Sequence, residues 1–181
     1  MNQNPQPSWE TDDNAGETCT VTREVAFRAV DHIALAVSDL DVAITFFRDT
    51  LGFTLVRRHH VKGATTGMVS AEMQSGRLKF VLCQGTEPQS QVSRLVSNFG
   101  VGVAHIALQV DDVADAVDCL RARGMRFDTS VIEGPGLTQA FTSRDPSTGM
   151  SFELIKRSGE QGFVDNNIQA LFEQMERSGS Y

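Results

Sequence analysis

Two histidines and one glutamate stand where they could hold a metal ion together. His32 opens the run HIALAV, His105 opens the run HIALQV 73 residues later, and Glu153 lies between two apolar residues in SFELIKR. Because successive side chains of a strand point to opposite faces, all three groups are expected opposite the apolar faces of their strands. Two imidazoles and a carboxylate leave up to three metal positions open, which suits non-haem Fe(II) and also Mn, Co, Ni or Zn. The sequence therefore predicts one divalent metal ion per subunit, with room for adjacent oxygens of a substrate.

An internal repeat gives the two histidines equivalent positions. Many residues 73 positions apart are identical, including Val30 with Val103, His32 with His105, Ile33 with Ile106, Ala34 with Ala107, Leu35 with Leu108, Val37 with Val110, Asp39 with Asp112, and Ala43 with Ala116. The chain thus contains two copies of one supersecondary unit. Overlaying FEL on FVL places Val81 where Glu153 stands. His59 and His60 have no repeat partner and point to opposite faces of their strand, so neither is expected in the site.

Each copy is expected to fold as a βαβββ module. The strand that begins with the histidine is followed by an acidic start, SDLD or DDVAD, and then by apolar residues at helical spacing. Gly52 and Gly124 are expected to end these helices. The further strands are predicted at 54–60, 67–73 and 78–83 in the first copy and at 126–132, 139–143 and 151–156 in the second.

The domain organisation follows from the repeat. Residues 1–22 are polar and are expected to form a flexible tail, and residues 23–181 form one α+β domain. Within it, module one covers about 29–88, a linker with a short helix about 89–101, and module two about 102–157. An amphipathic stretch then predicts a C-terminal helix at about 165–177.

Composition excludes several classes of function. The 181-residue chain has a formal net charge of -7, which argues against nucleic acid as a partner. No apolar stretch is long enough to cross a membrane, and the N-terminus resembles neither a signal peptide nor an anchor. Three cysteines without a CxxC spacing fit reduced thiols and receive no role. We therefore expect a cytoplasmic protein.

Residues 29–157 resemble the vicinal oxygen chelate superfamily, whose members pair two βαβββ modules into a metal-holding cup. The openings DHIALAVSDLDVAITFFRDTLGF and HIALQVDDV carry this resemblance. SQVSRLVSNFGVGVAHIAL, LTQAFTSRDPSTGMSFELIKR and GFVDNNIQALFEQMERSG are similar, in order, to the catalytic domain of 4-hydroxyphenylpyruvate dioxygenase and hydroxymandelate synthase. The resemblance implies that the C-terminal helix closes the substrate pocket. It also implies the pocket residues Ser70, Gln139, Phe141 and Asn167 beside the metal ligands His32, His105 and Glu153.

Three departures from that family bear on the substrate. The glutamine expected before the second metal histidine is Ala104, the aromatic residue expected after Asn167 is Ile168, and the GFG segment ends in Val164. Two side chains that would contact an aryl 2-oxo acid, one polar and one aromatic, are therefore missing. The dioxygenases also carry a second pair of modules that this sequence lacks, so we expect a homodimer in which a partner subunit adds cover.

Three hypotheses about function remain open. In the first, the protein is a metal-dependent epimerase of a small polyhydroxylated ketone, which the resemblance to single-domain 2-epi-5-epi-valiolone epimerases favours. Glu153 and Glu72, on the strand face of Ser70, are then the candidate proton carriers. In the second, it is an Fe(II) dioxygenase of a 2-oxo acid. In the third, it is a ligand-binding resistance protein, which the intact metal ligands disfavour.

Overall fold

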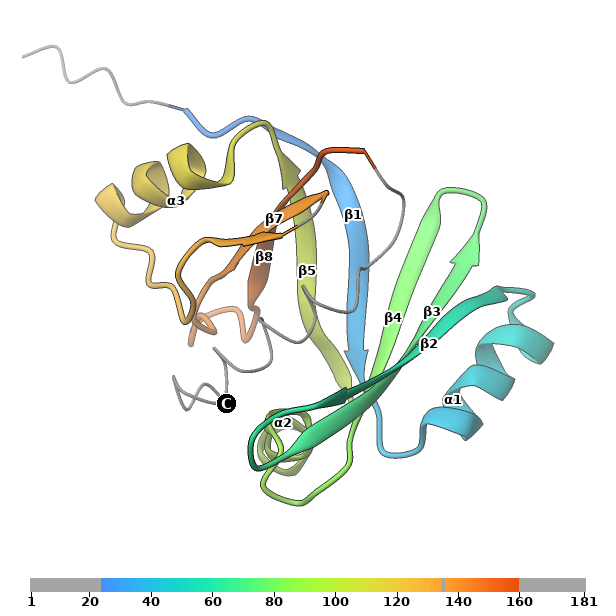
Figure 1. The fold of residues 1–181 in the computed structure, drawn as a ribbon. Coiled ribbons are helices and arrows are strands. Elements are labelled where there is room, and N and C mark those ends of the chain that lie inside the picture. The colour runs from blue at the N-terminus through green and yellow to red at the C-terminus, as the bar shows by residue number, and fades with distance from the viewer. Residues whose placement is uncertain (1–23, 135, 160–181) are drawn as a thin grey trace, which may run out of the picture.

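The computed structural model describes residues 24–134 and 136–159, which form one eight-stranded mixed sheet and its covering helices (Figure 1). The expected tail at 1–22 and the expected C-terminal helix at 165–177 lie outside the described residues. The strand order is β2-β3-β4-β1-β5-β8-β7-β6. The strands are β1 (Phe27–Ala36), β2 (Thr54–Lys62), β3 (Gly67–Ser75), β4 (Leu78–Gly85), β5 (Gly102–Val110), β6 (Ile132–Gly134), β7 (Leu137–Phe141) and β8 (Phe152–Arg157).

The repeat is visible in the register of the sheet. Strands β1 and β5 pair antiparallel, and Ile33 faces its own counterpart Ile106. The flanking pairs are His32 with Ala107 and Ala34 with His105, so the two modules are related by an approximate twofold axis at this joint. In each module the first strand also pairs parallel with the last, β1 with β4 and β5 with β8. The α+β fold of two related modules is confirmed.

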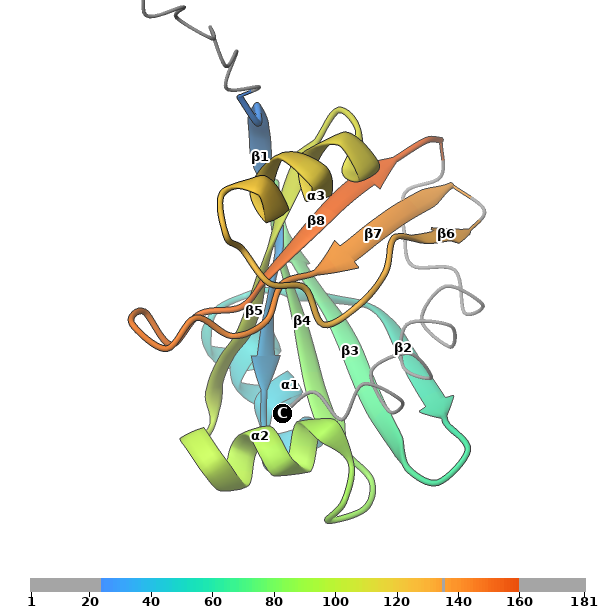
Figure 2. The ribbon, with the colours of Figure 1, turned by 90° about the vertical axis from the view of Figure 1, so that its left-hand side faces the viewer.

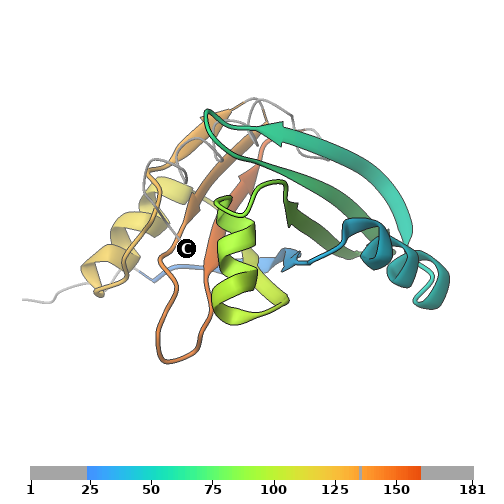
Figure 3. The same cartoon turned by 90° about the horizontal axis from the view of Figure 1, so that it is seen from below.

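Two helices cover the outer face of the sheet, one per module. Helix α1 (Leu40–Thr45) continues into a π-helical turn at Phe46–Thr50, and helix α3 (Val113–Ala122) takes the equivalent place in module two. Asp39 and Asp112 cap the two helices by accepting hydrogen bonds from backbone N–H groups three residues ahead. Figure 3 shows α1 and α3 on opposite flanks. None of the described helices is long and apolar enough to span a membrane.

Apolar side chains fix these helices against their own module. Leu40, Ile44 and Phe47 pack with Ala71, Met73 and Leu82, and Val113, Ala116, Val117 and Leu120 pack with Val110, Ala140 and Leu154. The polar residues of the repeated strands therefore face the other side of the sheet, as their alternation predicts. That inner side holds the candidate site.

Helix α2 (Gln91–Phe99) is the predicted linker helix, and it lies at one end of the inner side (Figure 2). Its Leu95 packs on small residues from both modules: Ala34 and Ala36 from β1 and Ala104 from β5. The linker thus joins the modules through contacts as well as through the chain.

The strand predicted at 126–132 is wrong. The structure has one bridge there, between Phe127 and Thr142, and a strand only from Ile132. Backbone pairing continues only as far as Asp128, whose N–H donates to the carbonyl of Phe141. At the next residue a side chain takes over, because Thr129 Oγ1 accepts the hydrogen bond from the backbone N–H of Phe141. Short polar side chains that bond to nearby backbone compete with sheet pairing, and this segment follows that rule.

Candidate metal centre

The three predicted ligands come together on the inner side of the sheet. His32 on β1, His105 on β5 and Glu153 on β8 each offer one donor atom, and these atoms lie within 4.8 Å of one another. The Nε2 atoms of the two histidines lie 3.3 and 3.4 Å from Oε2 of Glu153. The rings are nearly perpendicular, with centroids 5.6 Å apart, so both Nε2 atoms converge on the carboxylate. The repeat therefore places its two histidines and its single acid at one point.

A small residue makes this convergence possible. In the sheet register, His32 faces Ala107 on β5, and Ala107 faces Glu153 on β8. Ala107 is completely buried and its side chain is a methyl group, so the two ligands meet above it. Since neighbouring strands lie about 4.8 Å apart, a larger side chain here would separate the ligands. Ala107 is the repeat counterpart of Ala34.

A second acid orients His32. Asp31 Oδ1 lies 2.9 Å from His32 Nδ1, and Arg157 holds the same carboxylate with two contacts of 2.7 Å. A proton on Nδ1 leaves Nε2 as the donor to a metal, which is the usual role of a carboxylate behind a metal-binding histidine. Sequence reasoning did not single out Asp31 or Arg157. The acid directly before the histidine in DHIALAV was the available signal.

The charges around the site favour a proton on His32, and this proton must leave when a cation binds. Burial lowers the pKa of His32, but the charges of Glu153 and Asp31 outweigh it and raise this pKa to about 9. Burial raises the pKa of Glu153, but the two histidines outweigh it and lower this pKa to about 2. For His105, burial dominates and the pKa falls. Without a metal, the glutamate thus keeps its charge and a proton on His32 balances it.

The residues present fit a divalent cation. Glu153 is 1% exposed, and its Oε1 is a buried atom without a hydrogen-bond partner. A buried carboxylate oxygen is costly unless a donor or a cation satisfies it. Two imidazoles and one carboxylate on one side of a metal are a known ligand set for Fe(II), Mn, Co, Ni and Zn. His32, His105 and Glu153 would hold the ion, and Asp31 would orient one of them.

A cavity of about 60 Å³ opens beside the three ligands. The residues lining it include three that the resemblance implies, Ser70, Gln139 and Phe141. The ring of Phe141 stands perpendicular to His105, with centroids 5.0 Å apart. Gln139 is 1% exposed and its Oε1 has no hydrogen-bond partner. The fourth, Asn167, lies outside the described residues.

His59 also lines this cavity, against the expectation that neither adjacent histidine would belong to the site. It is 7% exposed, whereas His60 is exposed. Its Nε2 lies 3.0 Å from Oε1 of Glu72, the candidate proton carrier. Glu72 itself lines an adjacent small hollow that shares His32 and Val81 with the cavity. The search through the repeat missed His59 because it required a symmetric partner.

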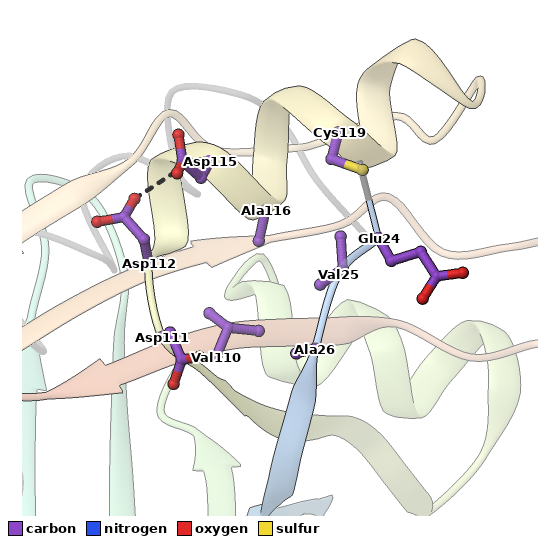
Figure 4. A pocket seen from close by; sticks show the side chains of 9 residues that line it. All are labelled: Glu24, Val25, Ala26, Val110, Asp111, Asp112, Asp115, Ala116 and Cys119. Carbon is purple, nitrogen blue, oxygen red and sulfur yellow. Dashed lines mark hydrogen bonds between the residues drawn. The ribbon is translucent and has the colours of Figure 1, made fainter. Parts of the chain in front are cut away.

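A larger hollow of about 150 Å³ lies elsewhere, where the chain enters β1 beside the start of α3 (Figure 4). Its wall is acidic, with Glu24, Asp111, Asp112 and Asp115. Asp111 pairs with Arg28, and Asp112 accepts the capping hydrogen bond from the backbone N–H of Asp115. These carboxylates serve the surface and the helix end, so we assign this hollow no chemistry.

Comparison with known proteins agrees with this geometry. The family model described as the Glyoxalase/Bleomycin resistance protein/Dioxygenase superfamily matches residues 29–154. The 4-hydroxyphenylpyruvate dioxygenases of Legionella pneumophila and Pseudomonas aeruginosa are 29% and 30% identical to the chain, covering 82% and 84% of it. The match covers 53% of either relative, so the chain spans about half the length of these curated relatives.

Solved structures of two enzyme types have the same fold. A triple mutant of 4-hydroxymandelate synthase from Streptomyces coelicolor superposes with a TM-score of 0.73 at 24% identity, covering 85% of this chain and 55% of that one. A variant of methylmalonyl-CoA epimerase from Streptomyces coelicolor superposes with a TM-score of 0.62 at 28% identity, covering 74% of this chain and all of that one. A synthase and an epimerase thus both have this fold.

Proposed function

The chain belongs to the Glyoxalase/Bleomycin resistance protein/Dioxygenase superfamily, and we propose that it is a metal-dependent epimerase of a small polyhydroxylated ketone. Its substrate would be a cyclitol ketone of the 2-epi-5-epi-valiolone type. The reaction would move a proton from one face of a carbon to the other through an enediolate. Such a reaction needs no oxidant.

The unsatisfied oxygen of Gln139 carries this proposal. It lies in the wall of the metal cavity, is buried, and has no hydrogen-bond partner. A substrate hydroxyl group can donate the hydrogen bond that this oxygen needs. Ser70, 2% exposed on the opposite module, adds a second group that can bond a hydroxyl. Gln139 and Ser70 are therefore two groups in a mainly apolar wall that can bond substrate hydroxyls.

One polar contact to an aryl 2-oxo acid is missing from the described wall. Ala104, which replaces a family glutamine, packs under Leu95 of α2 and does not line the cavity. The wall has a single phenyl ring, Phe141, which packs against the ligand His105. The loss of the glutamine supports a substrate other than the family's aryl 2-oxo acid.

The ligand set fixes where the chemistry would occur. A bound divalent cation would supply positive charge that makes the carbon next to a chelated carbonyl more acidic. Glu153 lies at that point, which makes its carboxylate a candidate to carry a proton beside the chelated atoms. Gln139 and Ser70 would hold the substrate hydroxyls and so select the carbon presented to it.

A deuterium experiment tests this function. The protein loaded with Mn, Co, Ni or Zn is incubated in heavy water under nitrogen with 2-epi-5-epi-valiolone and, separately, with the cyclic hydroxyketone myo-inosose. We expect deuterium at the carbon next to the carbonyl. Gln139→Leu should raise KM by about tenfold, the value of one hydrogen bond to a buried group. Absence of exchange with every metal would overturn the proposal.

An Fe(II) dioxygenase of a 2-oxo acid is the second candidate. The three-ligand set and the similarity to 4-hydroxyphenylpyruvate dioxygenases favour it. Oxygen consumption by the Fe(II) form with a panel of 2-oxo acids, and with none of the hydroxyketones, would establish it instead. The homodimer stays a prediction, which sedimentation of the metal-loaded protein would check.

A further inference from the structure

The two candidate metal histidines are held in different ways, although they occupy equivalent positions of the repeat. Asp31 lies 2.9 Å from Nδ1 of His32 and orients that ring. The residue at the same position before His105 is Ala104, whose methyl group cannot bond to an imidazole. Among residues 24–134 and 136–159, no hydrogen bond to Nδ1 of His105 is found. A different kind of contact therefore decides which way the second ring faces.

The backbone beside His105 is fixed, but this does not fix the ring. Arg144, in the loop between β7 and β8, donates a hydrogen bond of 2.9 Å from Nη2 to the carbonyl oxygen of Ala104. The torsion about the Cβ–Cγ bond of a histidine nevertheless takes a broad range of values. The imidazole can turn and carry Nε2 away from Glu153 unless neighbouring side chains hold it.

The ring of Phe141 supplies such a contact. It stands at 90° to the imidazole of His105, with centroids 5.0 Å apart. The ring of His32 contacts the same imidazole at 81°, with centroids 5.6 Å apart. Both distances are in the range in which edge-to-face aromatic pairs attract each other. With these two contacts, Nε2 of His105 lies 3.4 Å from Oε2 of Glu153.

Phe141 is itself held on both sides. It is 2% exposed, and it faces Glu153 in the register of β7 and β8. On the other side, its N–H donates to Oγ1 of Thr129, and its carbonyl accepts from the N–H of Asp128, both at 2.9 Å. A buried ring on a backbone bonded in this way has little freedom, so it can fix the position of a neighbouring ring.

Module one has different groups at the corresponding positions. The register aligns Phe141 with Glu72, because each faces the cavity residue of its last strand, Glu153 or Val81. At this position and at the position before the histidine, module one has an acid, whereas module two has a phenyl ring and a methyl group. From these positions, module two can therefore orient its histidine by packing alone.

We propose that Phe141 is the positioning residue of His105, in the role that Asp31 has for His32. The phenyl ring fixes the orientation of the imidazole through an edge-to-face contact and leaves Nδ1 without a hydrogen-bond acceptor. This inference rests on the metal centre and not on the reaction. It therefore holds for an epimerase and for a dioxygenase alike.

The first test measures metal affinity. Co(II), which ligand sets of this kind accept, is titrated into the protein in competition with a chelator. Phe141→Leu should bind Co(II) about tenfold more weakly than the wild type, because the contribution of one aromatic pair is lost. Phe127→Leu is the matched control, since its ring packs against the apolar cluster under α3, and its affinity should be unchanged. Equal affinities of the wild type and Phe141→Leu would overturn the proposal.

A second measurement needs no substitution. Imidazole protons of histidines bound to Co(II) resonate far outside the ordinary range of proton NMR, so each ligand can be followed separately. The Nδ1 proton of His32 should exchange slowly with water, because it donates to Asp31. That of His105 should exchange fast, since no carboxylate holds it and 16% of the side chain is exposed. Two slowly exchanging protons would mean that a hydrogen bond orients His105, and the proposal would be wrong.

The same spectra separate a positioning role from a merely structural one. In Phe141→Leu, the signals of His105 should shift and broaden while those of His32 stay, because only the second ring loses its contact. Asp31→Asn should change the signals of His32 and so identifies them. If the wild type binds no Co(II), the metal centre fails and the proposal with it. If Co(II) binds but both sets of signals change equally in Phe141→Leu, only the proposal fails.

Discussion

The two modules have the same fold, but at two pairs of corresponding positions one module has an ionisable side chain and the other an apolar one. Where β8 of module two presents Glu153 to the metal, β4 of module one presents Val81, and the register shows that both stand beside equivalent alanines. Where module one presents His59, module two presents Ile132. Each module therefore has an acidic or basic group where the other is apolar.

Because of this difference, the two modules contribute different groups to the same cavity. Both modules give a histidine from the same position of their first strand, and those two define the place of the metal. Module two adds the third ligand, and module one adds His59 with Glu72. A duplicated fold can thus place two equivalent histidines at the metal site and still present different side chains on either side of it.

Removing the carboxylate of module two should have the largest effect. Glu153→Ala should lose metal retention and activity altogether, because two histidines without the acid leave one coordination position and the charge balance unfilled. Metal content after dialysis, with circular dichroism to check folding, measures this. Val81→Ala at the symmetric position should keep its metal. Full metal content in Glu153→Ala would show that the modules do not differ as we describe.

A glutamate at position 81 of module one, which corresponds to Glu153, should give both modules an acidic side chain at the metal site. Val81→Glu should lower the free energy of unfolding of the metal-free protein by about 2 kcal/mol, because an additional charge enters the cavity wall. Added Zn should restore that stability, since a fourth ligand can now reach the ion. Val81→Gln controls for shape and should not be restored. Thermal melts with and without Zn give the answer, and identical responses of the two variants would contradict the symmetry.

The support behind His32 also differs between the modules, because the repeat counterpart of Asp31 is Ala104. Asp31→Asn should weaken metal binding by about 10- to 100-fold, the usual effect of removing such an outer carboxylate. Competition with a chelator measures the affinity. Asp111→Asn is the control, because its pair with Arg28 lies on the surface. An unchanged affinity in Asp31→Asn would mean that His32 needs no support.

Within any one pH unit, the smallest change is a gradual pH dependence of metal binding. The pKa of His32 is raised to about 9, so below that pH a proton must leave before the metal can bind. Affinity should therefore rise with pH up to about 9, by up to about tenfold per unit. Glu153 stays ionised over this range and adds nothing to the slope. Metal binding measured at several pH values, corrected for the chelator, tests this, and a flat profile would contradict it.

The repeat made much of the fold and the metal centre predictable. Alternation and the offset of 73 residues placed His32, His105 and Val81 correctly, because β-sheet pairing obeys the same period in both modules. Helix capping by Asp39 and Asp112 could also be predicted, because each aspartate bonds to a backbone N–H only three residues ahead. Each of these features depends on neighbours in sequence or on symmetry.

The features that sequence reasoning missed depend on neither. His59 stands where its counterpart is apolar, so the repeat gave no signal for it. The register of β1 shifts between Val30 and His32, and this irregularity lets Asp31 reach the ring beside it despite alternation. The false strand at 126–132 arose because its pattern showed no trace of the hydrogen bond that the Thr129 side chain accepts from the backbone of Phe141.

The order of strands has a consequence for how the site moves. The metal ligands lie on β1, β5 and β8, which are paired on both sides, whereas His59 lies on β2 at the edge of the described sheet. Edge strands open locally at lower free energy than central ones, so amide hydrogens of β2 should exchange with solvent well before those of β1 and β5. The three candidate metal ligands then lie on strands that open last, whereas the cavity residue His59 lies on the strand that opens first. Local opening of β2 would give small molecules a path into and out of the cavity, while the strands that carry the metal ligands stay paired.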